Sequence, residues 1–398
     1  EFVKECYELP KKEYLRKSQI EGWFVDILNP ITPQEIDKAI ARSSRDSAPG
    51  RSGVTNAMIK NLDKEGREIV REEFNKWMQQ RAIPDELNTA LIKLLPKTDK
   101  GLADLSAVRP IALMECLVKT YEQVMIGRTL SCLVDNGALD LDQFGAIPKA
   151  GVFAPLRILA EIISDANTHD KDLHIMVADL SKAFDTMEYW SQEMSWQAIG
   201  MPQGMIDILI NLDRGGQGEG QGATSCVSLA KGATTRNFKH GRGVRQGSVG
   251  GPLKWVLFVH FWMKWVKYKM KGKGYIMESD AKQRNINSSI RLEPDIKETQ
   301  EIIGMQFVDD SIWATRTAKA MQEMIALHKT FCEFHQVDLN MKKSEYHTHL
   351  SKKSRTAPAQ VNWPREQEDN SQATHDRTPH GERMMKEESY IKQQGKEF

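Results

Sequence analysis

The stretch Gln306-Phe307-Val308-Asp309-Asp310 places two adjacent carboxylates between two apolar-rich segments, residues 302–305 and 312–313. This pattern predicts two short strands with the acid pair at the turn between them. Aspartate favours turns, so the pair alone is more typical of a solvated turn than of a site. A second acid, Asp179, lies in another predicted strand, residues 174–180. Because acids occur on two separate apolar strands, the sequence predicts that they share one metal-ion site.

The composition is that of an ordinary globular chain. Its 398 residues suffice for one large or two ordinary domains, and 40% hydrophobic with 27% charged residues is typical of soluble proteins. No signal peptide or membrane-spanning run is evident, because the best candidate, residues 253–268, is interrupted by three lysines. The five cysteines are scattered without a C-x-x-C pair. This spacing argues against a zinc knuckle and a disulfide scaffold and fits a reducing compartment.

The charge is balanced overall but unevenly distributed. The net charge is +1, yet residues 220–277 contain eleven Lys and Arg and no Asp or Glu. A purely cationic block between two sets of carboxylates favours contact with a polyanion, and a lysine-rich solvated face is the alternative. The sequence begins at Glu1 without Met. We therefore expect it to be a piece of a longer polypeptide.

Local signals predict alternating helices and strands. Thr32-Pro33-Gln34-Glu35 is a helix start with a capping threonine, a proline at the first helical position and an acid three residues after the cap. The remaining expectations are helices at about 55–80, 116–134, 153–167 and 252–270, a hairpin formed by 91–97 and 107–113, and a helical core face within 321–331. Residues 271–300 form a polar connection with no assigned structure, and the polar tail 351–398 is predicted to be disordered.

The 91–113 hairpin carries Lys97 and Arg109 near its ends. Two such cations can hold a polyphosphate, arginine through its planar fork and lysine as a point charge. Either residue alone is more typical of an ordinary surface position than of a binding site. The acids complement this chemistry, because paired hard oxygen ligands on neighbouring strands suit Mg²⁺ and a two-metal phosphoryl transfer.

The motifs in order resemble the reverse transcriptase domain of non-LTR (LINE-like) retrotransposons. The resemblance rests on Asp179-x4-Phe184-Asp185, Arg245-Gln246-Gly247, Phe307-Val308-Asp309-Asp310 and Asn340-x2-Lys343-Ser344. Four upstream blocks agree in order: Ala48-Pro49-Gly50, Leu95-Pro96-Lys97, Arg109-Pro110-Ile111 and Gln143-Phe144-Gly145. The match covers about residues 40–350. Any single block is weak, but eight in sequence order are specific.

The resemblance implies a role for each matching residue. Asp179, Asp309 and Asp310 are implied metal ligands for two Mg²⁺ ions, with Mn²⁺ as an alternative, and Lys343 is the implied general acid toward pyrophosphate. The implied substrate-binding set is Lys97 and Arg109 for the triphosphate, Phe184 as a steric gate against ribonucleotides, and Gln246 with Gly247 beside the templating base and primer. Neighbouring Lys342 leaves open which lysine takes the acid role.

Two departures from the family pattern leave a second function open. Gln246-Gly247 continues as Ser248-Val249-Gly250-Gly251-Pro252 where the family usually has Asp-Pro-Leu-Ser-Pro, and Val308 stands where alanine is commoner. The alternative is a catalytically inactive nucleic-acid-binding remnant or a maturase-like RNA-binding protein. The altered loop and the loss of the family pattern after about Leu350 favour it, and the intact Asp179 and Asp309 oppose it. An RNA-dependent RNA polymerase is disfavoured by Phe184, because such enzymes typically place an acid near this point.

The expected fold is therefore α+β, a right-hand polymerase with fingers (about 40–170) and a palm whose antiparallel sheet is backed by helices. The expected domains are an N-terminal extension (1–39), reverse transcriptase fingers and palm (40–350), and the polar tail (351–398) with the thumb absent or incomplete. The implied activity is RNA-directed DNA synthesis, with an RNA template, a DNA primer and dNTPs as partners and no membrane. The expected location is intracellular, in the nucleus or as a cytoplasmic ribonucleoprotein in a eukaryotic host.

Overall fold

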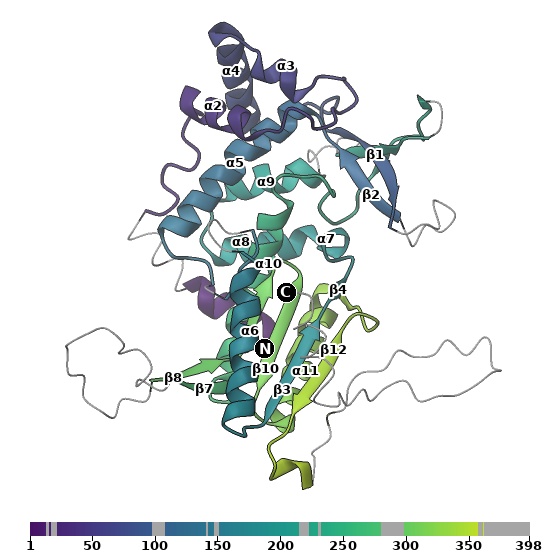
Figure 1. Ribbon diagram of the computed structural model, residues 1–398. Coiled ribbons are helices and arrows are strands. Elements are labelled where there is room, and N and C mark those ends of the chain that lie inside the picture. Colours follow the sequence, from purple (N-terminus) through teal and green to yellow (C-terminus); the bar gives the residue numbers. More distant parts are fainter. Residues whose placement is uncertain are drawn as a thin grey trace, which may run out of the picture. The chain divides into compact units, whose positions relative to one another are not determined.

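The computed structural model describes residues 1–12, 16, 22–97, 108–140, 142–146, 151–214, 223–229, 232–279, 298–356 and 361. Its chain forms two compact units, whose elements are labelled in Figure 1. Unit 1 comprises Glu1–Asp140 and Lys182–Trp262, and unit 2 comprises Leu141–Ser181 and Met263–Phe398. The expected fingers span of 40–170 therefore does not coincide with one compact unit, because its last part belongs to unit 2.

Unit 1 combines helices with a four-stranded sheet. Its elements are a short π-helical turn (Lys4–Glu8), α2 (Pro33–Arg42), α3 (Asn56–Lys60), α4 (Lys64–Gln80), β1 (Thr89–Pro96), β2 (Val108–Leu113), α5 (Cys116–Asp135), α7 (Ala183–Thr186), α8 (Tyr189–Ala198), α9 (Gln203–Arg214), β5 (Thr224–Val227), β6 (Phe238–Lys239) and the first part of α10 (Gly251–Met270). The sheet order is β2-β1-β5-β6, with β1 antiparallel to β2 and parallel to β5. The predicted β1–β2 hairpin is confirmed.

The N-terminal part of unit 1 is fastened to α5. Thr32 and Glu35 form the predicted capping box of α2. Arg128 of α5 then holds Glu35 through two hydrogen bonds of 2.6 and 2.8 Å and also donates to backbone carbonyls of residues 27–30. The segment preceding residue 40 is thus packed on the unit rather than separate from it.

The helix predicted over 55–80 is two helices, α3 and α4. The break occurs because Asp63 accepts a hydrogen bond from Gly66 N–H at 2.8 Å and so starts a new helix. The centre of unit 1 is aromatic, and its fully buried side chains include Trp196, Trp255 and Trp262.

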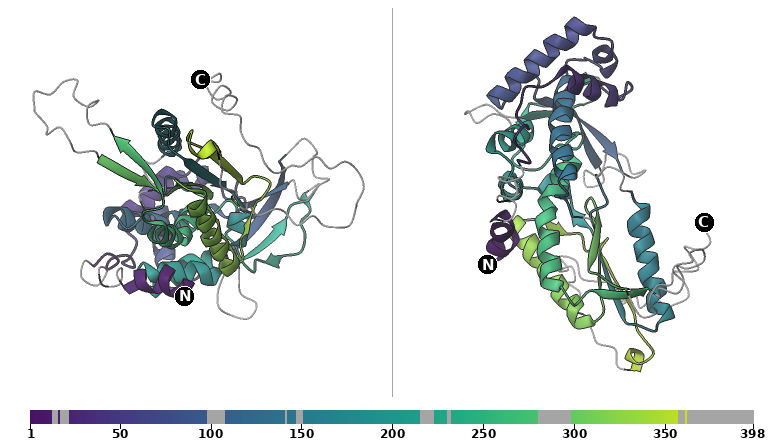
Figure 2. Two further views of the ribbon diagram at one scale, coloured as in Figure 1. Left: turned by 90° about the horizontal axis from the view of Figure 1, so that it is seen from below. Right: turned by 90° about the vertical axis from the view of Figure 1, so that its left-hand side faces the viewer.

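Unit 2 contains a second four-stranded sheet with a helix on each face, as Figures 1 and 2 show. Its elements are α6 (Phe153–Thr168), β3 (Leu173–Ala178), β4 (Leu180–Ser181), the second part of α10, β7 (Tyr275–Ser279), β8 (Glu298–Ile302), β9 (Gly304–Phe307), β10 (Asp310–Thr315), α11 (Ala318–His335), β11 (Asp338–Leu339), β12 (Glu345–His349) and a short 3₁₀ turn (Ser354–Thr356). The sheet order is β12-β3-β10-β9, antiparallel throughout, and α6 and α11 cover its two faces.

The core of unit 2 follows from the apolar alternation of these strands. Ile175 of β3 and Ala314 of β10 are buried together with Ile162 of α6. On α11, Met321, Met324, Ile325 and Phe331 are buried, which confirms the predicted helical core face.

Residues 271–300 contain a pair of strands that the sequence did not predict. β7 and β8 pair antiparallel from Tyr275 with Ile302 to Ser279 with Glu298. Glu298-Thr299-Gln300-Glu301 lacks the apolar alternation of a strand, so its structure depends on pairing with β7 rather than on local pattern.

The start of the polar tail is held in place. Asp172 accepts hydrogen bonds from Ser351 N–H at 2.7 Å and Ser354 Oγ at 2.6 Å. The rest of the tail, apart from residues 355–356 and 361, lies outside the described residues. Among the helices that the structure describes, none is both long and apolar enough to cross a membrane.

Candidate active site

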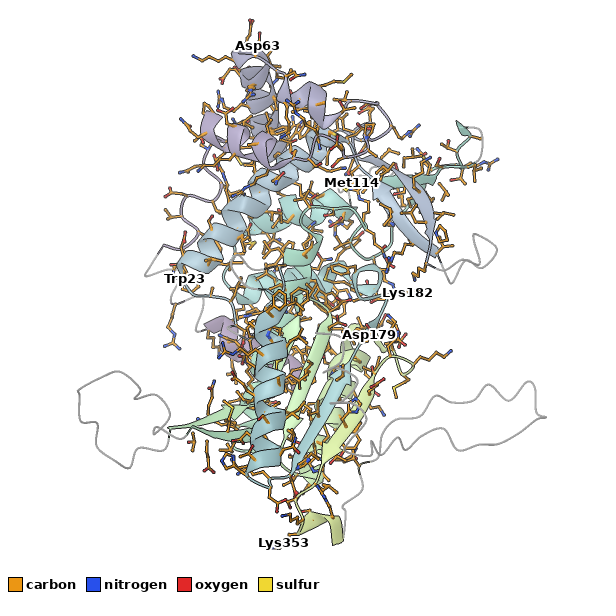
Figure 3. The ribbon with its side chains drawn as sticks, in the orientation of Figure 1. Trp23, Asp63, Met114, Asp179, Lys182 and Lys353 are labelled. Atoms are coloured by element: carbon orange, nitrogen blue, oxygen red, sulfur yellow. The ribbon has the colours of Figure 1, made fainter. Side chains whose placement is uncertain are left out.

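The strands of unit 2 bring the three predicted metal ligands to one end of the sheet. Asp179 directly follows β3, as labelled in Figure 3, and Asp310 begins β10. Because Ser311 pairs with Ala178, the antiparallel register places Asp310 opposite Asp179 one step further along. Asp309 occupies the turn between β9 and β10. The predicted hairpin with the acid pair at its turn is confirmed.

The charges of these acids act on one another. The pKa of Asp309 is raised, first by burial and then by the negative charges of Asp310 and Asp179, with Lys343 opposing the shift. Asp310 is exposed, but partial desolvation and the charge of Asp179 still raise its pKa, and Lys343 again opposes the shift. Crowded carboxylates of this kind favour a cation, because each ionised group disfavours the next.

Residues after β11 surround Asp179. Asn340 donates to Asp179 twice, from Nδ2 to Oδ2 and from its backbone N–H to the carbonyl, both at 2.8 Å. Asp179 N–H donates to Ser344 Oγ at 3.1 Å. Lys343 Nζ lies 3.6 Å from Asp179 Oδ2, on a side chain that is 69% exposed. Lys343 therefore lies beside the carboxylate of Asp179.

The carboxylates fit a metal site that substrate completes. In the described part of the chain, no group of three or more His, Cys, Asp or Glu side chains is arranged to hold a metal ion by itself. Mg²⁺ in phosphoryl-transfer sites binds through one or two carboxylates and completes its shell with water and substrate phosphates. The oxygens of Asp179, Asp309 and Asp310 provide that chemistry without a preformed three-ligand cage.

The other predicted site residues belong to unit 1. Leu95 pairs with Arg109 in the β1–β2 hairpin, and Lys97 lies two residues beyond Leu95. Lys97 directly follows the end of β1 and Arg109 is the second residue of β2, so both cations lie near the same end of the hairpin. Both are exposed. The hairpin therefore presents two neighbouring cations.

A second group in unit 1 forms around Asp185. Gln246 Nε2 lies 3.2 and 3.4 Å from the two carboxylate oxygens of Asp185. The pKa of Asp185 is raised by burial, while the Gln246 hydrogen bond and the charges of Lys182 and Lys97 lower it. Lys97, Gln246 and Asp185 thus share one electrostatic environment.

Gly247 is required by the backbone. Its φ is +128°, and a Cβ there would lie 2.4 Å from the carbonyl oxygen of Ala112. The adjoining Gln246 carbonyl accepts from Ala112 N–H at 2.7 Å. The Gln246-Gly247 turn is consequently pressed against β2, a contact that any side chain at position 247 would break.

Phe184 lies in α7 and packs on α10. Its ring centroid is 5.6 Å from that of Trp255 at an interplanar angle of 44°. The carbonyl of Phe184 also accepts from Val244 N–H at 2.8 Å. The half-buried ring is therefore held by the residues on either side of the Gln246 turn.

A buried network of charged side chains contacts the residues on either side of the Gln246-Gly247 turn. Lys254 Nζ lies 2.5 Å from Asp213 and 3.7 Å from Glu122, and all three side chains are almost fully buried. Glu122 accepts from Ser248 Oγ at 2.5 Å and from Val249 N–H at 2.9 Å. Arg245 donates to Asn88 Oδ1 at 2.8 Å. Glu122 of α5 thus supplies a carboxylate at the start of α10, where Ser248 replaces the family's usual aspartate.

Sequence reasoning missed several supporting residues. Asn340 and Asp185 belong to the motifs that resemble the family, but the sequence alone assigns no role to either residue. In the structure each contacts a site residue. Glu122 and Gln143 had no role at all, because their partners are 126 and 165 positions away. The sequence marks Gln143 only as part of the motif block Gln143-Phe144-Gly145. That motif does not reveal which residue Gln143 contacts.

Comparison with known proteins agrees with this arrangement of motifs. The family model described as reverse transcriptase (RNA-dependent DNA polymerase) matches residues 95–375. A Pol polyprotein from a type-1 R2 retrotransposable element of Nasonia vitripennis is 26% identical over 61% of this chain and 22% of its own length. A probable RNA-directed DNA polymerase from transposon X-element of Drosophila melanogaster is 24% identical over 58% of this chain and 25% of its own length.

A solved structure of apo telomerase from Candida tropicalis, truncated from its C-terminal domain, aligns with a TM-score of 0.45 at 11% identity, covering 74% of this chain and 60% of that chain. The chain spans only about a quarter of the two curated relatives described above. Both relatives are named for retrotransposable elements or transposons, and the family model covers most of the chain. The chain belongs to the reverse transcriptase (RNA-dependent DNA polymerase) family, with relatives among non-LTR retrotransposons.

Proposed function

We propose that the chain catalyses RNA-directed DNA synthesis, adding dNTPs to a DNA primer on an RNA template for a retrotransposon. The observation that carries the proposal is the placement of Asp179, Asp309 and Asp310 at one end of an antiparallel sheet, with charges that act on one another. Family membership supports the same chemistry. The host location we propose is intracellular, in the nucleus or in a cytoplasmic ribonucleoprotein.

In this proposal the β12-β3-β10-β9 sheet is the palm of a right-hand polymerase and the β1–β2 hairpin belongs to the fingers. The fingers and palm occupy residues 40–350, preceded by an extension (1–39) and followed by the polar tail (351–398). Antiparallel strands covered by α6 and α11 support the palm assignment.

The acids hold the metal in this reaction. Two Mg²⁺ ions, or Mn²⁺, would bind Asp179, Asp309 and Asp310, and when bound they activate the primer 3′-hydroxyl and neutralise the leaving pyrophosphate. Asn340 fixes the orientation of Asp179 through its two hydrogen bonds. The primer 3′-hydroxyl gives its proton to solvent and its oxygen bonds to the α-phosphorus of the dNTP as the bond to pyrophosphate breaks. Lys343 Nζ gives a proton to that leaving group and regains one from solvent.

The unit 1 residues bind and select the nucleotide. Lys97 and Arg109 hold its triphosphate from one end of the β1–β2 hairpin. Phe184 excludes a 2′-hydroxyl by its ring, which Trp255 supports. Gln246 and Gly247 line the templating base and primer. These roles follow from the family resemblance together with the local contacts described above.

Primer extension on an RNA template tests the proposal. Asp309→Asn should lower dNTP incorporation with Mg²⁺ by about 10³-fold or more, because phosphoryl transfer depends mainly on charge neutralisation. Asp338→Asn, an exposed acid that begins β11, is the matched control and should act like wild type. Equal incorporation by wild type and Asp309→Asn would disprove the site assignment.

The second candidate is a nucleic-acid-binding protein without catalysis. The altered loop Ser248-Val249-Gly250-Gly251-Pro252 favours it, whereas the cationic block 220–277 fits both candidates. It predicts salt-dependent template binding with no incorporation by the wild-type chain. The same primer-extension experiment therefore separates the two candidates.

A further inference from the structure

The turn that carries Asp309 has an unfavourable backbone conformation. Val308 has φ = +60°, whereas Asp309 is not among the residues with positive φ. A two-residue hairpin loop with positive φ only at its first position has the pattern of a type II′ turn, where glycine is preferred. A β-branched residue there is a genuine outlier and persists only when its surroundings hold it. Something must therefore hold Val308 in place.

Gln143 makes the contact that does so. Its Oε1 accepts hydrogen bonds from Val308 N–H at 3.0 Å and from Gly145 N–H at 2.9 Å. Two backbone donors on one atom identify that atom as the amide oxygen rather than the nitrogen. Gln143 Nε2 then donates to Gln306 Oε1 at 3.2 Å, so the side chain is satisfied although only 4% exposed.

The backbone on either side of Gln143 is paired to β9. Phe144 N–H donates to the Gln306 carbonyl at 2.8 Å, and Gln306 N–H donates to the Asp142 carbonyl at 2.8 Å. Asp142 also forms an ion pair with Lys267 of α10 at 2.5 Å. The segment 142–145 is thus an anchored strand-like edge beside β9 and not a free loop.

Gly145 brings this edge into contact with the turn. A Cβ at position 145 would lie 2.4 Å from both Val308 Cγ2 and Val308 N. Only glycine allows such an approach, which leaves the Val308 isopropyl group packed against the backbone of the edge. The hydrogen bond from Val308 and this packing together fix the backbone position of Val308, and with it the position of the next residue, Asp309.

We infer that Gln143 is a positioning residue for the metal-binding carboxylate of Asp309, acting through the Val308 N–H. The inference rests on the proposed role of Asp309. Supporting groups around metal ligands typically change metal affinity by about 10–100-fold when they are removed, because the ligand loses its fixed orientation. The side chain of Gln143 contacts the Val308 and Gly145 backbone and Gln306, so its proposed role is to position Asp309 and not to take part in catalysis.

The test compares substitutions of two buried glutamines, Gln143 and Gln306, whose side chains hydrogen-bond to each other. Gln143→Met removes the acceptor for Val308 N–H with little change in volume, and Gln306→Met leaves both Oε1 contacts of Gln143 intact. Mn²⁺ binding to the substrate-free chain is measured by the loss of its free EPR signal. We expect Gln143→Met to weaken Mn²⁺ binding about tenfold, with Gln306→Met much closer to wild type. Amide hydrogen exchange at Val308 should accelerate only in Gln143→Met.

A rescue variant separates positioning from simple loss of folding. Val308→Gly removes the need to hold a β-branched residue at positive φ. Combined with Gln143→Met it should restore most of the Mn²⁺ affinity, which a general packing defect would not allow. Equal affinity in Gln143→Met and wild type, or equal losses in the two methionine variants, would overturn the inference. Asp309→Asn tests the metal site itself. If this variant binds Mn²⁺ as tightly as wild type, the proposed metal site is wrong.

Discussion

At the scale of single residues, the acids that define the site are costly to the fold. Burial raises the pKa of Asp309, and the negative charges of Asp310 and Asp179 raise it further. An acid whose pKa is raised in the folded state destabilises the protein increasingly above its unfolded-state pKa, and in full once the pH exceeds the folded-state pKa. The cost disappears below the pKa of the unfolded chain, where the acids are protonated in both states. Strain and like charge are thus tolerated where a cation is expected to bind.

Asp309→Asn should therefore stabilise the metal-free protein. We expect its free energy of unfolding at pH 7 to rise by about 0.5–2 kcal/mol, the range of single stabilising changes that sacrifice function. The gain should shrink as the pH falls through the raised pKa and vanish below the unfolded value. Urea unfolding in a chelator at several pH values measures this dependence.

Metal and a control variant complete that test. Added Mg²⁺ should stabilise wild type but not Asp309→Asn, because only the former has the full ligand set. Asp338→Asn should show neither effect, since Asp338 is exposed at the start of β11. A stability loss in metal-free Asp309→Asn at pH 7 would contradict this account of the site.

At the scale of elements, α10 carries a buried and a half-exposed ion pair. Lys254 and Lys267 each lie 2.5 Å from an aspartate, but the Lys254 and Asp213 side chains are 0% and 2% exposed, whereas those of Lys267 and Asp142 are 23% and 44% exposed. Removing one member of a buried pair leaves an uncompensated charge in a medium of low dielectric. Solvent screens the partner of a surface pair. The two lysines therefore form a matched comparison.

Lys254→Met should cost about 3–5 kcal/mol of unfolding free energy because it removes the nearest cation from the buried carboxylate of Asp213 and a cation from that of Glu122. Lys267→Met should cost about 1 kcal/mol or less. Denaturant unfolding of both variants under the same conditions measures the difference. Similar costs for the two substitutions would show that the network around Glu122 does not support the start of α10.

The elements also show which parts of the fold were predictable from sequence. The β9–β10 hairpin, the β1–β2 hairpin and α2 follow from apolar alternation or capping residues within a few positions. The β7–β8 pair does not, because Glu298-Thr299-Gln300-Glu301 carries no strand pattern. Local signals therefore predict elements with their own periodicity and miss those that depend on a partner.

The candidate site divides in the same way. The positions of the acids were predictable because they lie next to apolar segments and because their motifs occur in the order that the family shows. Gln143 and Glu122 were not, since their hydrogen bonds to Val308 and Ser248 join segments more than a hundred positions apart. Nor could the sequence reveal that Val308 adopts φ = +60°, which depends on the contact with Gly145.

At the scale of the whole molecule, the uneven distribution of charge bears on the proposed binding of nucleic acid. The net charge of +1 gives no general attraction, so binding must come from local cations such as those of residues 220–277. Part of this block forms the edge of the unit 1 sheet, where Arg236 and Lys239 are exposed and Phe238 between them is 40% exposed. Cations next to an exposed ring suit phosphate contact and base stacking.

Template binding should therefore depend on salt through this edge. In the variant Arg236→Ala/Lys239→Ala, the slope of log K against log salt concentration should fall by up to about 2, about one unit for each phosphate that the removed cations neutralise. Affinity should fall similarly for RNA templates of different sequence, because phosphate contacts carry no base specificity. Lys76→Ala is the matched control, since Lys76 is 62% exposed on α4 and outside the block. Fluorescence anisotropy across a salt series measures the slopes, and an unchanged slope in the double variant would place the template elsewhere.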